Sequence, residues 1–302
     1  MSKSVLLKSS LAKKYWMALT GLFLCLFLVG HLAGNLQLLK AGEEGRRAFN
    51  EYAYFMAHNP VVKILSYLTY ISIIFHVIDG FLLFAQNRKA RPVKYAHTRP
   101  QENSSFASRN MALLGTLILV FIVTHMQNFW YKAKISNGPF PLHTLVKEID
   151  NQEYDPATGA IVNKKQDVKL YLLTNGQYQM IDLEDKDNIE LRHNTEIYSK
   201  KLDVKVAEGY KDLHSLTTAF FGHDNSKYGF PKNDLATVAV IFYVVSMLVL
   251  IFHLWHGFSS AFQSLGLRSK KYAPIIITVG KIFAVVVPVL FAVIPVYLYL
   301  TK

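Results

Sequence analysis

Five long apolar stretches divide the chain, and each is long enough to cross a bilayer as a helix. A hydrocarbon core of about 30 Å requires roughly 20 apolar residues in a helix. We therefore predict an all-α membrane protein with a bundle of five transmembrane helices. The predicted spans run approximately over residues 15–39, 61–85, 111–130, 235–265 and 274–300.

The region between the third and fourth apolar stretches, residues 133–233, has a different pattern. Residues 168–173 and 178–183 both have strand-like composition, and the turn pair Asn175-Gly176 lies between them, which predicts a β-hairpin. Residues 210–221 have apolar positions at helical spacing and are predicted to lie along the membrane surface. The chain thus divides into helices 1–3 (residues 1–132), a partly β insertion of about 100 residues (133–233), and helices 4 and 5 (234–302).

Charge is distributed unevenly along the chain. The net charge is +12, from 33 basic and 21 acidic residues, but the insertion holds 13 basic and 15 acidic residues, which leaves 20 against 6 for the remainder. This pattern excludes a plain soluble enzyme and argues against a nucleic-acid module, whose charge lies on a polar surface. The basic residues cluster before the first span, between the second and third, and between the fourth and fifth. The positive-inside rule places these segments in the cytoplasm, with the insertion and the C-terminus outside.

Histidine is the main candidate for metal chemistry. Cys25 is the only cysteine, so the chain by itself forms no internal disulfide, c-type haem attachment or Cys-ligated iron–sulfur cluster. Ionisable residues inside a span are costly and indicate function. The predicted spans contain five histidines: His31, His76, His125, His253 and His256.

Depth sorts these histidines into two pairs. With a rise of about 1.5 Å per residue, His31 and His125 lie roughly 21–22 Å from the cytoplasmic starts of their helices, toward the outer face. His76 and His256 lie on helices that run inward, and both lie toward the cytoplasm. His253 is one turn before His256 on the same face, and only one of the two is needed. The sequence favours His256 because Gly257 follows it, without deciding the matter.

Two histidines on separate helices in apolar surroundings are typical of bis-imidazole ligation of haem b. Two pairs at two depths would carry an electron across the bilayer. Zinc fits less well, because a closed zinc site requires four ligands at one depth. A proton relay fits less well also, because Asp79 is the one carboxylate within the spans. Glycines near the histidines would leave room for a porphyrin edge, although helix packing favours the same residues.

Asp79 and Lys281 are the other charged residues that lie deep in the spans. Each lies roughly 10 Å from the cytoplasmic end of its helix. Two hypotheses follow: the two side chains pair with each other, or Lys281 meets a propionate of the inner haem. The alternative for Lys281 is that its side chain extends and places the ammonium at the membrane–water interface.

The sequence resembles the cytochrome b subunit of succinate:quinone oxidoreductases, in the five-helix, two-haem b558-type branch of succinate dehydrogenase and fumarate reductase membrane anchors. The resemblance extends over all spans that carry motifs. The matching stretches are SLAKK at 10–14, GHLAGNL at 30–36, FH at 75–76 with Gly80, NRKARP at 87–92, ASR at 107–109, TH at 124–125 and HLWHGFSSAFQSLG at 253–266.

The resemblance implies a function and a set of partners. His31 and His125 would ligate the iron of a distal haem b, and His76 and His256 that of a proximal haem b. In this family a flavoprotein with FAD and an iron–sulfur protein sit on the cytoplasmic face, and quinone, usually menaquinone, reacts within the membrane subunit. The resemblance therefore implies a subunit of succinate dehydrogenase or fumarate reductase in the cytoplasmic (inner) membrane of a bacterium, within respiratory complex II and the tricarboxylic acid cycle.

The chain departs from the family in its long outer insertion, whose role the sequence does not indicate. Some relatives have a carboxylate after the first helix that takes the quinol proton, and the nearest candidate here is Glu51. The alternative is a solvated residue on an interfacial helix with Arg46 and Arg47. Two other functions stay open: a di-haem cytochrome b of a hydrogenase or formate dehydrogenase, and a haem-free transporter or anchor. A transporter would contain repeats or broken helices, and none is visible.

Overall fold

Five long helices dominate the computed structural model, which describes residues 9–90, 93, 102, 104–136, 138–155 and 159–302. In this part of the chain five helices are long and apolar enough to cross a membrane, so the prediction of five spans is confirmed. They are α2 (Ser10–Asn35, continued by the 3-10 turn η1, Leu36–Leu39), α4 (Pro60–Lys89), α7 (Met111–Met126, continued by the π-helical η2, Gln127–Tyr131, and α8, Lys132–Lys134), α10 (Ala236–Ser264) and α11 (Ala273–Leu300).

The helices extend beyond the apolar stretches because polar residues cap them. Ser9 accepts a hydrogen bond from the backbone of Ala12, so α2 begins five residues before the predicted span. Asn59 accepts from the first backbone N–H groups of α4, and Pro60 follows it at a position where a missing N–H costs nothing. Capping chemistry, rather than hydropathy, sets these boundaries.

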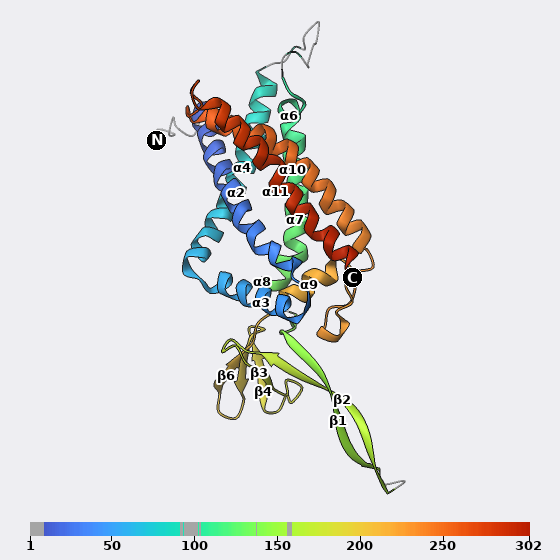
Figure 1. The fold of residues 1–302 in the computed structure, drawn as a ribbon. Helices are drawn as coiled ribbons and strands as arrows, with labels where there is room; N and C mark the ends of the chain where they lie inside the picture. The colour runs from blue at the N-terminus through green and yellow to red at the C-terminus, as the bar shows by residue number, and fades with distance from the viewer. Residues whose placement is uncertain (1–8, 91–92, 94–101, 103, 137, 156–158) are drawn as a thin grey trace.

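The helices pack into one bundle with the chain ends at opposite sides (Figure 1). α10 lies along α11, and α2 packs against α4, α10 and α11. α10 and α11 approach closely at Gly280 of α11, where a Cβ atom would lie 2.6 Å from the ring of Phe258 on α10. A side chain at this glycine would therefore force the two helices apart.

Two shorter helices lie across the end of the bundle that is opposite the N-terminus (Figure 1). α3 (Gly42–His58) connects α2 to α4, and α9 (Leu213–Phe220) precedes α10. α9 occupies the middle of the predicted helix at 210–221, and it begins after Asp212, whose side chain caps the backbone of Ser215. α3 and α9 are in contact.

The insertion forms two three-stranded antiparallel sheets between the third and fourth long helices. The first sheet contains β1 (Thr144–Asp155), β2 (Ala160–Leu172) and β3 (Tyr178–Met180), and the second contains β4 (Ile189–Arg192), β5 (Glu196–Ser199) and β6 (Val204–Glu208). The predicted hairpin is present, with Leu172 opposite Tyr178, but β3 ends at Met180 rather than 183. β1 and β2 form a long ribbon that extends away from the bundle (Figure 1).

Candidate functional site

The first pair of histidines joins α2 to α7. The ring centroids of His31 and His125 are 5.9 Å apart and their planes are perpendicular. Phe27 stacks on His31 and Phe121 stacks on His125, so aromatic rings enclose the pair. The structure therefore brings together the two histidines that the sequence assigned to the outer level.

The second pair joins α4 to α10, and here the structure differs from the sequence interpretation. His76 faces His253, with ring centroids 6.3 Å apart, whereas the sequence favoured His256 as its partner. His256 instead shares a hydrogen bond of 3.1 Å between its Nε2 and the hydroxyl of Ser260. The physical reason is the rotation of α10, which turns His253 toward Gly115 of α7 and His256 toward a neighbouring pocket.

Hydrogen bonds hold three of the four paired rings through Nδ1. His76 Nδ1 lies 3.2 Å from the Thr20 hydroxyl, His125 Nδ1 lies 3.2 Å from the Tyr243 hydroxyl, and His31 Nδ1 lies 3.5 Å from the Asn35 amide. Outer partners of this kind orient metal-bound imidazoles and fix which nitrogen is free to bind. These contacts at Nδ1 leave Nε2 as the nitrogen available to a metal ion in each of the three rings.

His253 makes no hydrogen bond within the described residues, and its Nδ1 is fully buried. Buried polar atoms are normally paired, so an exception requires an explanation such as a ligand. A Cβ atom at Gly115 would lie 3.7 Å from His253, and one at Gly21 would lie 3.2 Å from His76. Both imidazoles thus lie close to a neighbouring helix backbone, and a side chain at Gly21 would press against His76.

The distances between the paired rings fit two imidazoles on opposite sides of one metal ion. A metal–nitrogen bond of about 2.0 Å on each side, added to the radius of each ring, separates the centroids by roughly 6 Å. In the described residues no three side chains of His, Cys, Asp and Glu gather as in a site held by protein ligands alone. Two imidazoles per site are the number that haem iron takes from a protein.

The two pairs lie at different levels along α2. Thr20 of α2 contacts His76. His31 lies eleven residues after Thr20 on the same helix, a distance of about 16 Å along the helix axis. The pairs therefore lie one behind the other across the thickness of the bundle, which agrees with the depth that the sequence predicted.

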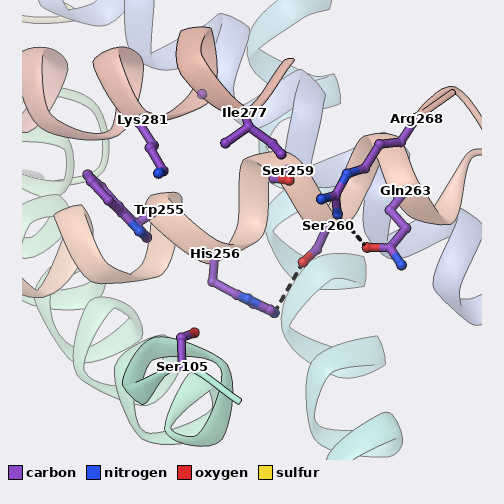
Figure 2. Close-up of a pocket in the computed structure, with 10 residues that line it drawn as sticks. Ser105, Trp255, His256, Ser259, Ser260, Gln263, Arg268, Ile277 and Lys281 are labelled. Carbon is purple, nitrogen blue, oxygen red and sulfur yellow. Dashed lines mark hydrogen bonds between the residues drawn. The ribbon is translucent and has the colours of Figure 1, made fainter. Parts of the chain in front are cut away.

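Lys281 and Asp79 do not approach each other as the pairing hypothesis expected. The Lys281 ammonium lies 5.3 Å from the centre of the Trp255 ring, in a pocket that also contains His256 (Figure 2). Asp79 interacts electrostatically with Lys13 and His76 instead. Lys281 is thus placed on the His256 side of α10, and His256 differs from His253 by about 60° around the helix axis.

Glu51 lies on α3 and forms an ion pair with Arg47 one turn earlier, with 2.7 Å between Oε1 and Nε. The Arg47 guanidinium also donates to the carbonyl of Gly176 in the insertion, over 3.0 Å. More than a third of each charged side chain is exposed. In this arrangement Glu51 orients an arginine that reaches the insertion.

A buried polar junction, which the sequence did not indicate, connects α3 to the insertion and α9. Arg46 is 4% exposed, and it donates to Asp212 with distances of 2.5 and 3.0 Å and to Ser215 with 3.0 Å. Its guanidinium also donates to the carbonyl of Thr144 and lies over the ring of Tyr228. Burial alone would raise the pKa of Asp212, but the charge of Arg46 keeps it below its usual range.

The same junction continues through Asn50 to His143. The Asn50 amide nitrogen donates to Asp212 over 2.8 Å and lies 2.8 Å from His143 Nδ1, while the Asn50 oxygen accepts from the backbone of His214. His143 Nδ1 must then accept, so its Nε2 carries the proton and donates to Glu43 over 2.6 Å. His143, fully buried, is therefore held by hydrogen bonds at both ring nitrogens.

Acid is expected to loosen this junction. Burial would raise the pKa of Glu43, but the hydrogen bond from His143 and the charge of Arg46 lower it from about 4.5 to about 2. A group with a lowered pKa in the folded state contributes stability that is complete above its unfolded pKa and is lost as the pH falls.

Between pH 4.5 and 2 we expect proteolysis within the insertion to accelerate, and Glu43→Gln to weaken this pH dependence. Glu44→Gln, at an exposed neighbouring position, is the control, and equal pH profiles for Glu43→Gln and the wild type would contradict the assignment.

Comparisons with known proteins found no match for this chain among protein-family models, curated proteins or solved structures.

Proposed function

We propose that this chain is a di-haem cytochrome b and the membrane subunit of a succinate:quinone oxidoreductase. The observation that carries the proposal is the presence of two histidine pairs between helices, with centroids 5.9 and 6.3 Å apart, at two levels of one bundle. The residue resemblance that runs from 10–14 to 253–266 supports the choice of complex.

In this proposal His31 and His125 hold the outer haem b, and His76 and His253 hold the inner one. His253 replaces His256 because it faces His76 and has no hydrogen-bond partner among the described residues. Haem b supplies one-electron transfer when it is bound. Thr20, Asn35 and Tyr243 orient three of the imidazoles through Nδ1, and the surrounding aromatic side chains exclude water from the outer pair.

The partners follow from the same proposal. A flavoprotein with FAD and an iron–sulfur protein would bind the end of the bundle that carries the N-terminus, where the basic connections lie. Quinone, with menaquinone as the expected type, would exchange electrons with the haems in the membrane. The insertion would then lie outside the cytoplasm, as the positive-inside rule predicts.

A difference spectrum tests this function. Membranes that contain the chain are expected to give a b-type α-band when reduced with dithionite, and succinate is expected to reduce part of the same band when the partner subunits are present. The absence of a b-type band would end the haem proposal. A band that responds to hydrogen or formate but not to succinate would favour a hydrogenase or formate dehydrogenase subunit.

Glu51 is tested separately, because its ion pair with Arg47 gives it a structural role. We expect Glu51→Gln to lower the unfolding free energy by less than about 1 kcal/mol, as for other exposed pairs, and to leave haem content and quinone turnover unchanged. Steady-state assays with a soluble quinone analogue measure turnover. A fall of about 100-fold with both haems present would instead assign Glu51 to proton transfer, since general acid–base groups contribute effects of that size.

A further inference from the structure

A polar pocket lies between α10 and α11, close to the start of the short helix α6 (Phe106–Arg109). It encloses about 260 Å³. Figure 2 shows its side chains gathered around one space, with His256 and Ser260 joined by a hydrogen bond. The polar side chains that line it include Lys281, Arg268, His256, Ser259, Ser260 and Gln263.

The pocket carries positive charge without a compensating carboxylate. Lys281 and Arg268 both line it, and its lining contains no acidic residue among those the structure describes. Arg268 donates to the neutral amide of Gln263 over 3.0 Å, and Lys281 lies 5.3 Å from the centre of the Trp255 ring. A cation within a membrane span is costly unless it has a partner, so Lys281 calls for an anion, and Arg268 in the connection after α10 adds a second positive charge beside it.

The surroundings of the pocket indicate that the anion belongs to the bilayer. Trp255 is 42% exposed, and the apolar side chains of Ile275, Val279 and Ile282 on α11 are more than half exposed in the isolated chain. Acyl chains would cover such a surface in a membrane. Lys281 lies about 12 Å from the start of α11, a depth from which its extended side chain reaches the headgroup level.

We propose that this pocket binds the phosphate of an anionic phospholipid in the leaflet at the N-terminal end of the bundle. Lys281 and Arg268 supply the charge, the hydroxyls of Ser259 and Ser260 donate to phosphate oxygens, and the acyl chains lie along the exposed face of α11. Basic pockets between transmembrane helices recognise lipid headgroups through this combination of groups. Lys281 contacts Trp255 and Arg268 contacts Gln263, so the site is built from residues other than the paired histidines.

The test compares lipid binding by the full chain in nanodiscs, with phosphatidylglycerol in a phosphatidylcholine background. Each cation near an anionic lipid contributes a factor of about five, so Arg268→Gln with Lys281→Met is expected to weaken phosphatidylglycerol binding by about 25-fold. Native mass spectrometry of the released protein counts the retained lipid. Lys270→Gln with Lys271→Gln removes two exposed charges from the same connection and is expected to change binding by less than about twofold.

A charge-conserving variant separates the site from general damage to the fold. Lys281→Arg is expected to keep the lipid, and the helical circular dichroism of every variant is compared with that of the wild type. Equal lipid retention in the double pocket variant and the wild type would overturn the proposal, as would an equal loss in the loop control. Displacement of the lipid by millimolar inorganic phosphate would indicate a small-anion site and overturn the lipid assignment. A shifted haem potential in Lys281→Met with unchanged lipid would assign Lys281 to a haem propionate instead.

Discussion

Replacing His253 with glutamine is expected to remove one of two b haems, while the same change at His256 leaves both. The two residues are one turn apart on α10, so the variants differ little in position or polarity. His253 faces His76 across 6.3 Å and has a buried Nδ1 without a partner among the residues that the structure describes, whereas His256 is hydrogen-bonded to Ser260. Loss of an axial imidazole removes one of the two bonds that hold haem iron in the chain.

Haem content per chain, measured as the pyridine haemochrome, gives a direct reading of this difference. About half of the wild-type value is expected for His253→Gln, with the α-band of the remaining haem unchanged. His256→Gln serves as the matched control and should retain the full value. The reverse result, with loss at His256 and retention at His253, would restore the pairing that the sequence favoured.

The buried ion pair at the junction is expected to have the largest effect on stability. Arg46→Met leaves the carboxylate of Asp212 buried without its cation, and breaking a buried pair of this kind costs about 3–5 kcal/mol. In the Arg46→Met variant we expect protease to cut the insertion (residues 133–233) under conditions where the wild-type insertion stays intact. Denaturant titration of the chain in detergent, followed by tryptophan fluorescence, measures the change in unfolding free energy.

Arg47 offers a matched control for this experiment. It is the next residue on α3 and also pairs with a carboxylate, but both partners are more than a third exposed. Arg47→Met should therefore cost only about 0–1 kcal/mol. Replacing both buried partners, as Arg46→Met with Asp212→Leu, should recover part of the loss because no isolated charge remains. Similar losses for Arg46→Met and Arg47→Met would show that the junction does not hold the insertion in place.

The spans could be predicted from the sequence because each is a local property. A run such as residues 274–300 is apolar in any packing arrangement, and its length alone fits a bilayer. The depths of His31 and His125 followed from counting residues along those helices, and the structure places the two rings 5.9 Å apart. Helix ends were less predictable, because caps such as Ser9 and Asn59 are polar and lie outside the apolar pattern.

The choice between His253 and His256 could not be made from the sequence. The two residues differ by only about 60° around the helix axis, which is within the uncertainty of any helix rotation inferred from hydropathy. Packing of α10 against Gly115 on one side and α11 on the other fixes that rotation. The pocket around Lys281 was hidden for the same reason, because its lining comes from three segments whose relative positions depend on this packing.

By itself, the sequence determined that this chain has five apolar helices, a polar insertion before the fourth, and histidines at two depths. Those properties depend on residue type and on distance along a single helix. The tertiary structure alone decided that His253 rather than His256 faces His76, where Lys281 lies, and that Arg46 meets Asp212 across 166 positions of chain. Such pairings depend on how separate elements rotate and pack against each other. No local sequence pattern indicates that rotation or packing, so these contacts could not be predicted from the sequence.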